Sequence, residues 1–151
     1  MAYESLLLKN ALNMFFPQNL LEIRRFYLQA WQKKLNKDAL SALEAQICQV
    51  ITQHPEYQRF LQEDCLDKDF KEANPFFHMG LHLAVLDQIQ LDKPQGIRDI
   101  YQKLMHQYQN THEVEHRMMD ILQIILWQAQ EKKQLPDEQS YLRACQELCH
   151  G

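Results

Sequence analysis

Two pairs of histidines, each with three residues between its members, are the residues of this chain best suited to chemistry. His78 and His82 form the first pair, and His112 and His116 form the second. Side chains four residues apart share one face of an α-helix, so both imidazoles of a pair can reach a single ion at roughly 2.0–2.1 Å from each nitrogen. The spacing therefore predicts a metal site, for which nitrogen ligands favour zinc, iron or nickel.

Two glutamates accompany the second pair. Glu115 follows His112 by three residues, so on a helix it lies on the same side. Its carboxylate is a candidate further ligand. Glu113 points nearer to His116 and is a candidate general base acting on metal-bound water. The same residues match the His-Glu-x-x-His pattern of zinc peptidases. A peptidase is the less favoured interpretation, because those enzymes usually have an uncharged residue before the second histidine and offer a strand to the peptide.

The two pairs differ in their predicted surroundings. His78 and His82 fall on the apolar stripe of their helix, and burying an imidazole without a partner costs roughly 1–3 kcal/mol. Each of them therefore needs a hydrogen bond or a metal, and satisfied core histidines are the alternative to ligands. His112 and His116 fall off the main apolar stripe of their helix, so a surface position is the alternative for them.

Two other groups of potential ligands have simpler explanations. His54 precedes Pro55 and Glu56, where capping at a helix start accounts for it. Cys145 and Cys149 share a helix face, but a pair of half-buried, reduced thiols near the end of a helix explains that spacing as well.

Composition predicts a soluble all-α protein in the cytoplasm. The 151 residues are 46% hydrophobic and 24% charged, with only three glycines and five prolines, which leaves little turn chemistry for a many-stranded sheet. The formal net charge of -4 argues against a nucleic-acid partner, and no apolar run reaches the roughly 18–20 residues of a membrane span. The start of the chain lacks a signal-peptide pattern. A homo-oligomer and a small-molecule or protein partner stay open.

Apolar residues at spacings of three and four predict about six or seven helices in a single domain over residues 1–151. We expect a first helix over residues 1–16, and a helix capped by Asn36 or Asp38 after the second one. The charged stretch 62–73 is the expected surface linker.

The second half of the chain is predicted to form an antiparallel helical bundle. Asn74 and Pro75 have the types expected of an N-cap and a first helical residue. Short connections then separate three predicted helices, over residues 75–89, 94–109 and 111–134. Such connections place consecutive helices side by side, which would bring the two histidine pairs together.

Five motifs extend over most of the chain: His54 to Tyr57, Asn74 to Met79 with His82, Asp92 to Ile97, His112 to Met119, and Trp127 to Gln130. Together they resemble the bacterial family labelled domain of unknown function 1841. The resemblance implies a small bacterial cytoplasmic protein and assigns no activity to it.

Three functions are compatible with the sequence, and it does not decide whether the protein is an enzyme. The first is a helical protein that binds a metal ion through the two histidine pairs. The second is a non-catalytic interaction module in which the histidines are structural. The third is a bundle that responds to pH, because clustered histidines titrate near neutrality.

Overall fold

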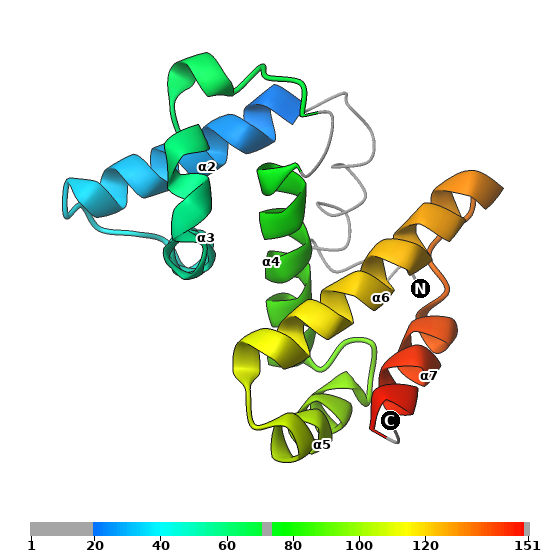
Figure 1. The fold of residues 1–151 in the computed structure, drawn as a ribbon. Helices are drawn as coiled ribbons and strands as arrows, with labels where there is room; N and C mark the ends of the chain where they lie inside the picture. Colours follow the sequence, from blue (N-terminus) through cyan, green and yellow to red (C-terminus); the bar gives the residue numbers. More distant parts are fainter. Residues whose placement is uncertain (1–19, 71–73, 150–151) are drawn as a thin grey trace. The chain divides into compact units, whose positions relative to one another are not determined.

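The computed structural model describes residues 20–70 and 74–149, and this part of the chain is helical. It forms six α-helices and two 3-10 helices and contains no β-strand (Figure 1). The predicted all-α class is therefore confirmed. The helix predicted over residues 1–16 lies outside the described residues. In the described chain, no helix is both long and apolar enough to cross a membrane.

The chain divides into two compact units, and the boundary falls inside one helix. Unit 2 comprises the described residues up to Leu83, and unit 1 comprises those from Ala84 onward. The single domain and the antiparallel bundle expected from the sequence stay predictions.

Unit 2 is built on two helices, α2 (Leu20–Leu35) and α3 (Ala42–Gln53), which contact each other (Figure 1). The expected cap of α3, Asn36 or Asp38, is wrong. Ser41 is the N-cap: its hydroxyl accepts from the backbone N–H of Glu44 at 3.1 Å, and the Glu44 carboxylate accepts from the N–H of Ser41 at 2.8 Å. This capping box satisfies two otherwise orphaned amides, which neither earlier residue could do.

A buried arginine fastens the segment that follows α3, which contains η2 (Pro55–Phe60) and η3 (Glu63–Cys65). Arg24 of α2 is 3% exposed and donates to the carbonyls of Leu66 and Lys68, at 2.9 and 2.8 Å. Burial lowers the pKa of Arg24, and the Asp69 and Asp67 carboxylates oppose that shift. Leu66 is buried beneath this segment, and the surface linker over residues 62–73 stays a prediction.

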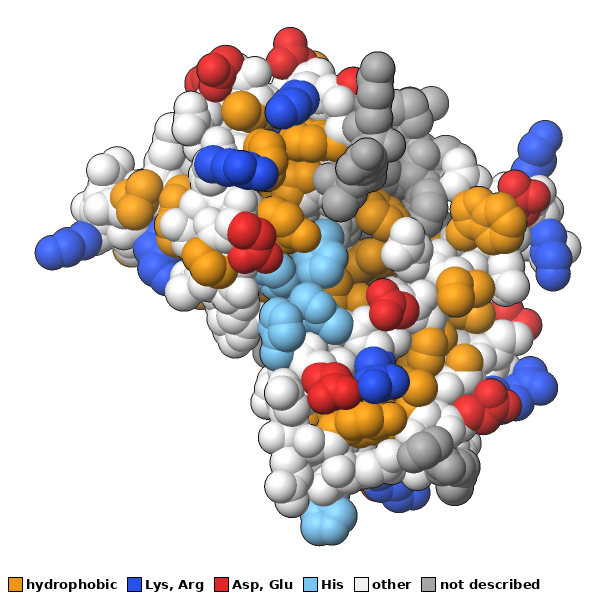
Figure 2. Space-filling model, viewed as in Figure 1, with side chains coloured by type: hydrophobic (Ala, Val, Ile, Leu, Met, Phe, Trp, Pro, Cys, Tyr) orange, Lys and Arg blue, Asp and Glu red, His pale blue; other side chains and the backbone are white. Residues whose placement is uncertain are grey.

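Cationic side chains lie against aromatic rings in this unit. The Arg24 guanidinium lies 5.3 and 5.0 Å from the ring centres of Phe70 and Phe76, and the Lys68 ammonium lies 5.4 Å from that of Phe60. Hydrophobic and basic side chains accordingly lie next to one another around α2 and the 3-10 helices (Figure 2). These contacts attract the cation to the ring quadrupole and help to hold the segment in place.

Helix α4 (Pro75–Leu91) confirms the predicted helix over residues 75–89. The Asn74 side chain accepts from the backbone N–H groups of Phe76 and Phe77, at 3.0 and 3.2 Å, as expected of an N-cap. The helix is apolar on all sides, and its buried side chains include Phe76, Met79, Leu81, Leu83 and Val85. Such a helix is stabilised by apolar contacts on all of its faces rather than on one face.

Unit 1 continues with α5 (Ile97–Tyr108), which starts later than the predicted position 94. The Asp92 carboxylate accepts from the backbone N–H groups of Gly96 and Arg98, at 3.1 and 3.0 Å, so it holds the residues before Ile97 in a loop. Gly96 has a φ of 101°, a conformation that a residue with a Cβ rarely adopts. The helix can therefore begin only after Gly96.

The sequence predicts that helix α6 (Thr111–Lys132) is capped by Asn110, which the structure confirms. The buried face predicted from its apolar spacing comprises Val114, Met118, Ile121, Leu122, Ile125 and Ala129, and all are buried except the half-buried Ile121. The apolar residues Ile124, Leu126 and Trp127 predict a wider face; Leu126 is fully buried, but Ile124 and Trp127 are each 55% exposed. Both lie on the opposite side of the helix.

Proline suits the first turn of a helix, so Pro136 is predicted to open the last helix. Helix α7 (Glu138–Leu148) instead begins after Asp137, whose carboxylate accepts from two backbone N–H groups. It contacts α5 and α6 (Figure 1). The Tyr141 hydroxyl donates to the side-chain oxygen of Gln88 at 2.6 Å, in a fully buried hydrogen bond. This bond connects α7 to the second half of α4.

Candidate metal centre

His54 ends helix α3 and has a defined protonation pattern. Its Nδ1 lies 2.8 Å from the backbone oxygen of Val50, and the residue is 1% exposed. A carbonyl oxygen can only accept, so Nδ1 must carry a proton and donate it. In the neutral imidazole the other nitrogen, Nε2, then holds a lone pair.

His78 faces that lone pair from the first turn of α4. Its Nε2 lies 3.1 Å from the Nε2 of His54, and the ring centres are 4.8 Å apart at an angle of 73°. The short distance between the two nitrogens requires a positive charge or a proton between them. Either one imidazole donates an Nε2–H to the other, or both lone pairs point at a cation.

The distance between these nitrogens is suited to a shared ion. Two nitrogens bonded to zinc at about 2.05 Å lie 3.1 Å apart when the angle at the metal is about 98°. That angle lies between the octahedral and tetrahedral values. The Nδ1–H of His54 also donates to a backbone carbonyl, as the second ring nitrogen of a metal-binding histidine usually does. Such a hydrogen bond fixes the tautomer and directs Nε2 at the ion.

His82 adds a third imidazole from the same unit. It lies one turn after His78 on α4, is fully buried, and places its ring centre 5.2 Å from that of His54 at 90°. The sequence expectation of a buried first pair is therefore correct for His82, whereas His78 is half-buried. Histidine side chains reach the surface in the space-filling view (Figure 2).

The second pair lies on α6 in unit 1. The ring centres of His112 and His116 are 3.9 Å apart, with His112 exposed and His116 half-buried. Proximity of the two rings is what their spacing on one helix predicts. The ligand set His78, His82, His112, His116 and Glu115 stays a prediction.

The two glutamates of α6 have different surroundings. Glu115 is 3% exposed, and its carboxylate accepts from the hydroxyl of Tyr101 at 3.1 Å. Burial, and then the Glu115 charge, raise the pKa of Tyr101 to about 12. Glu113 instead accepts from the guanidinium of Arg117 through one oxygen, at 3.2 and 3.0 Å. That oxygen is already engaged by a cation, which weakens the case for Glu113 as a base.

The surroundings of His54 differ from those expected from the sequence. Capping at the start of the helix after Pro55 was the expected role, but the His54 side chain makes no capping hydrogen bond there and instead donates to Val50 at the end of α3. The same bond leaves Nε2 directed at His78. The available signal was the position of His54 directly before Pro55, because a proline ends the helix and presents the preceding side chain at its end.

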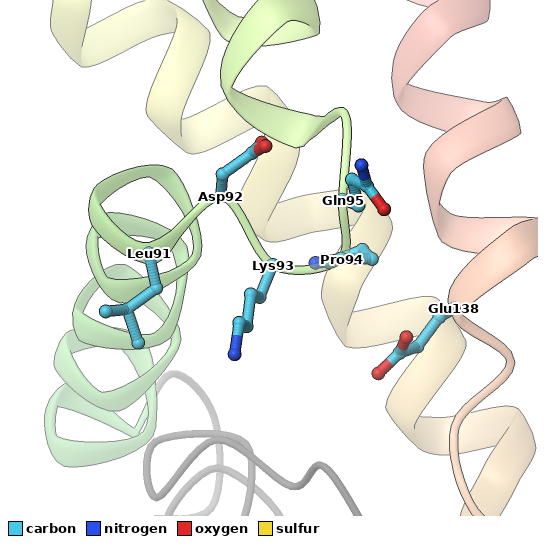
Figure 3. A pocket seen from close by; sticks show the side chains of 6 residues that line it. All are labelled: Leu91, Asp92, Lys93, Pro94, Gln95 and Glu138. Carbon is cyan, nitrogen blue, oxygen red and sulfur yellow. The ribbon is translucent and has the colours of Figure 1, made fainter.

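A pocket of about 390 Å³ lies elsewhere, in unit 1, at the connection between α4 and α5. Its lining residues are Leu91, Asp92, Lys93, Pro94, Gln95 and Glu138 (Figure 3). The side chains of Asp92 and Lys93 point to opposite sides of the connection (Figure 3). The lining includes none of the predicted ligands, so the pocket has no part in the histidine cluster.

Comparison with known proteins supplies a family. No curated protein and no solved structure matches the chain. Residues 19–147 match the family described as a domain of unknown function (DUF1841), in agreement with the resemblance seen in the sequence motifs. The match includes every histidine of the two pairs and His54. Because it extends over most of the sequence, the chain belongs to the DUF1841 family.

Proposed function

We propose that the protein binds a divalent metal ion and that the imidazoles of His54 and His78 are two of its ligands. The observation that carries this proposal is the 3.1 Å distance between their Nε2 atoms. It is supported by the hydrogen bond that the Nδ1–H of His54 donates to the backbone oxygen of Val50, because the neutral imidazole then has a lone pair on Nε2, the nitrogen that faces His78. Both residues belong to unit 2, so the pair is defined within one compact part of the chain.

The remaining ligands are proposed from the sequence. His82 is the next imidazole on α4, and His112, His116 and Glu115 complete the set that the spacing predicts. Nitrogen-rich ligation suits zinc, iron or nickel. An ion with an open position would lower the pKa of a bound water to about 7 and make hydrolysis accessible. From the sequence we also infer a cytoplasmic, bacterial protein without nucleic-acid or membrane partners.

A non-catalytic helical module is the second candidate, and the same distance supports it. An N–H···N hydrogen bond from His78 to His54 would also have a length near 3.1 Å. In that case the two rings simply connect the end of α3 to the start of α4. The metal-binding protein and the non-catalytic module differ in the Nε2 proton of His78. A shared ion requires that His78 has no hydrogen on Nε2.

Calorimetric titration of the full, untagged chain with Zn²⁺, Ni²⁺, Mn²⁺ and, without oxygen, Fe²⁺ tests the proposal. We expect about one equivalent of at least one ion. We expect His54→Ala and His78→Ala each to weaken binding by more than the roughly 10–100-fold typical of losing an outer contact. His106→Ala, which removes an exposed histidine of α5, is the matched control and should bind normally. Absence of binding to all four ions, or unchanged affinity in both variants, would overturn the proposal.

A further inference from the structure

Tyr57 covers one face of the His54 imidazole. The two rings are parallel within 3°, with their centres 5.4 Å apart, and the backbone N–H of Tyr57 donates to the oxygen of His54 at 2.9 Å. The phenol ring also meets the His78 ring at 70°, with centres 5.5 Å apart. Tyr57 is thus an aromatic side chain that contacts both proposed ligands within unit 2.

We propose that Tyr57 is a positioning residue for the metal-binding nitrogen of His54, a role that rests on the proposed metal site. The hydrogen bond to Val50 fixes one atom of the imidazole, and the ring can still pivot about that point. A parallel aromatic ring removes that remaining motion, because offset stacking favours one orientation of the two planes. With its plane fixed, His54 keeps Nε2 directed at His78.

The face of the phenol performs this function, not its hydroxyl. The contacts that Tyr57 makes with the two proposed ligands are ring contacts: its plane is parallel to the imidazole of His54 and lies at 70° to that of His78. A phenylalanine should replace it without loss, whereas an aliphatic side chain of similar bulk should not.

The experiment compares wild type, Tyr57→Phe, Tyr57→Leu and Tyr57→Met as full chains. Long-range ¹H–¹⁵N spectra without metal report the tautomer of His54, and calorimetry with Zn²⁺ reports affinity. We expect wild type and Tyr57→Phe to show His54 only with its proton on Nδ1, and the two aliphatic variants to show both tautomers. We expect zinc affinity to fall about 10-fold or more in the aliphatic variants alone.

These readouts separate the two proposals. A single Nδ1–H tautomer in both aliphatic variants, or zinc affinity equal to that of wild type, would overturn the role of Tyr57 while leaving the metal site intact. Wild-type protein that binds none of the four ions would overturn the metal site, and the tautomers would then decide the role of Tyr57 alone. Two aliphatic variants are made in case one of them does not fold. Circular dichroism identifies a folded variant, and one folded variant is enough for the comparison.

Discussion

The Nε2 atoms of His54 and His78 lie 3.1 Å apart, although the two residues are 24 positions apart in the chain. One ring ends α3 and the other belongs to the first turn of α4. Each is placed by the backbone geometry of a helix end, and both ends carry a side-chain cap. The site therefore depends on where two helices stop and start.

Replacing the cap of α4 should affect both stability and the site. Asn74→Ala removes the acceptor for the N–H groups of Phe76 and Phe77, which should lower the free energy of unfolding by about 1 kcal/mol. Because His78 lies in that first turn, zinc affinity should fall as well. Urea denaturation and calorimetry measure the two effects. Asn74→Asp retains a capping oxygen and should restore stability; an alanine variant as stable as wild type would show that the cap is not needed.

The buried carboxylate of α6 should depend on Tyr101. Tyr101→Phe leaves the nearly inaccessible Glu115 without the hydroxyl that donates to it at 3.1 Å. Loss of a partner for a buried charged group costs about 1–3 kcal/mol, so the unfolding midpoint in urea should fall. Tyr108→Phe is the matched control, because it keeps the ring that lies 4.8 Å from the Arg117 guanidinium. Equal stability of the two variants would contradict the assignment.

Stability should decrease at alkaline pH. Burial and the Glu115 carboxylate raise the pKa of Tyr101 to about 12, and burial also raises the pKa values of Tyr27 and Tyr141. A free tyrosine titrates near pH 10, so between about pH 10 and 12 the folded state holds more protons than the unfolded state. The contribution of Tyr101 is thus fully present below pH 10 and is lost as the pH rises through that window.

Urea denaturation at pH 9, 10 and 11 checks this trend. The free energy of unfolding should fall mainly between pH 10 and 11, and it should fall less steeply in Tyr101→Phe, which lacks one of the shifted groups. A flat profile in the wild type over this range would show that these hydroxyls ionise equally in both states.

The four cysteines should divide into two reactivity classes. Burial raises the pKa of the Cys145 thiol to about 12, so only about one molecule in ten thousand carries the reactive thiolate at pH 8. Cys48 is also buried and donates to the backbone oxygen of Ala30 at 3.3 Å. Cys65 and Cys149 are half-buried. With an aromatic disulfide reagent we expect two thiols to react quickly in the folded chain and four in urea; four fast thiols in the folded chain would contradict the structure.

Helix positions were largely predictable because apolar spacing and capping residues act locally. Asn74 and Asn110 cap the helices that their types indicate, and the buried face of α6 follows from its periodicity. One error arose where several caps competed, at the start of α3. Ser41 caps α3 instead of Asn36 or Asp38 because Ser41 and Glu44 each accept a hydrogen bond from the backbone N–H of the other. The Ser-x-x-Glu pattern that forms this capping box was present in the sequence.

The candidate site was predictable only in part, since its central contact joins distant segments. Spacing on a helix identifies His78 with His82, because helical neighbours are fixed by local geometry. It carries no information about His54, which reaches His78 only through the packing within unit 2. Exposure on α6 was misjudged for a related reason: Ile124 and Trp127 are apolar, but the contacts that decide which face is buried are tertiary.

The central claim is that the Nε2 atoms of His54 and His78 bind the same ion. A long-range ¹H–¹⁵N spectrum of the full chain, recorded before and after one equivalent of Zn²⁺, tests it most directly. We predict that the Nε2 signals of both residues move together to the metal-bound range, that His54 keeps its proton on Nδ1, and that His106 does not change. A His78 ring that keeps its proton on Nε2 in the presence of zinc would contradict the account and identify the contact as a hydrogen bond.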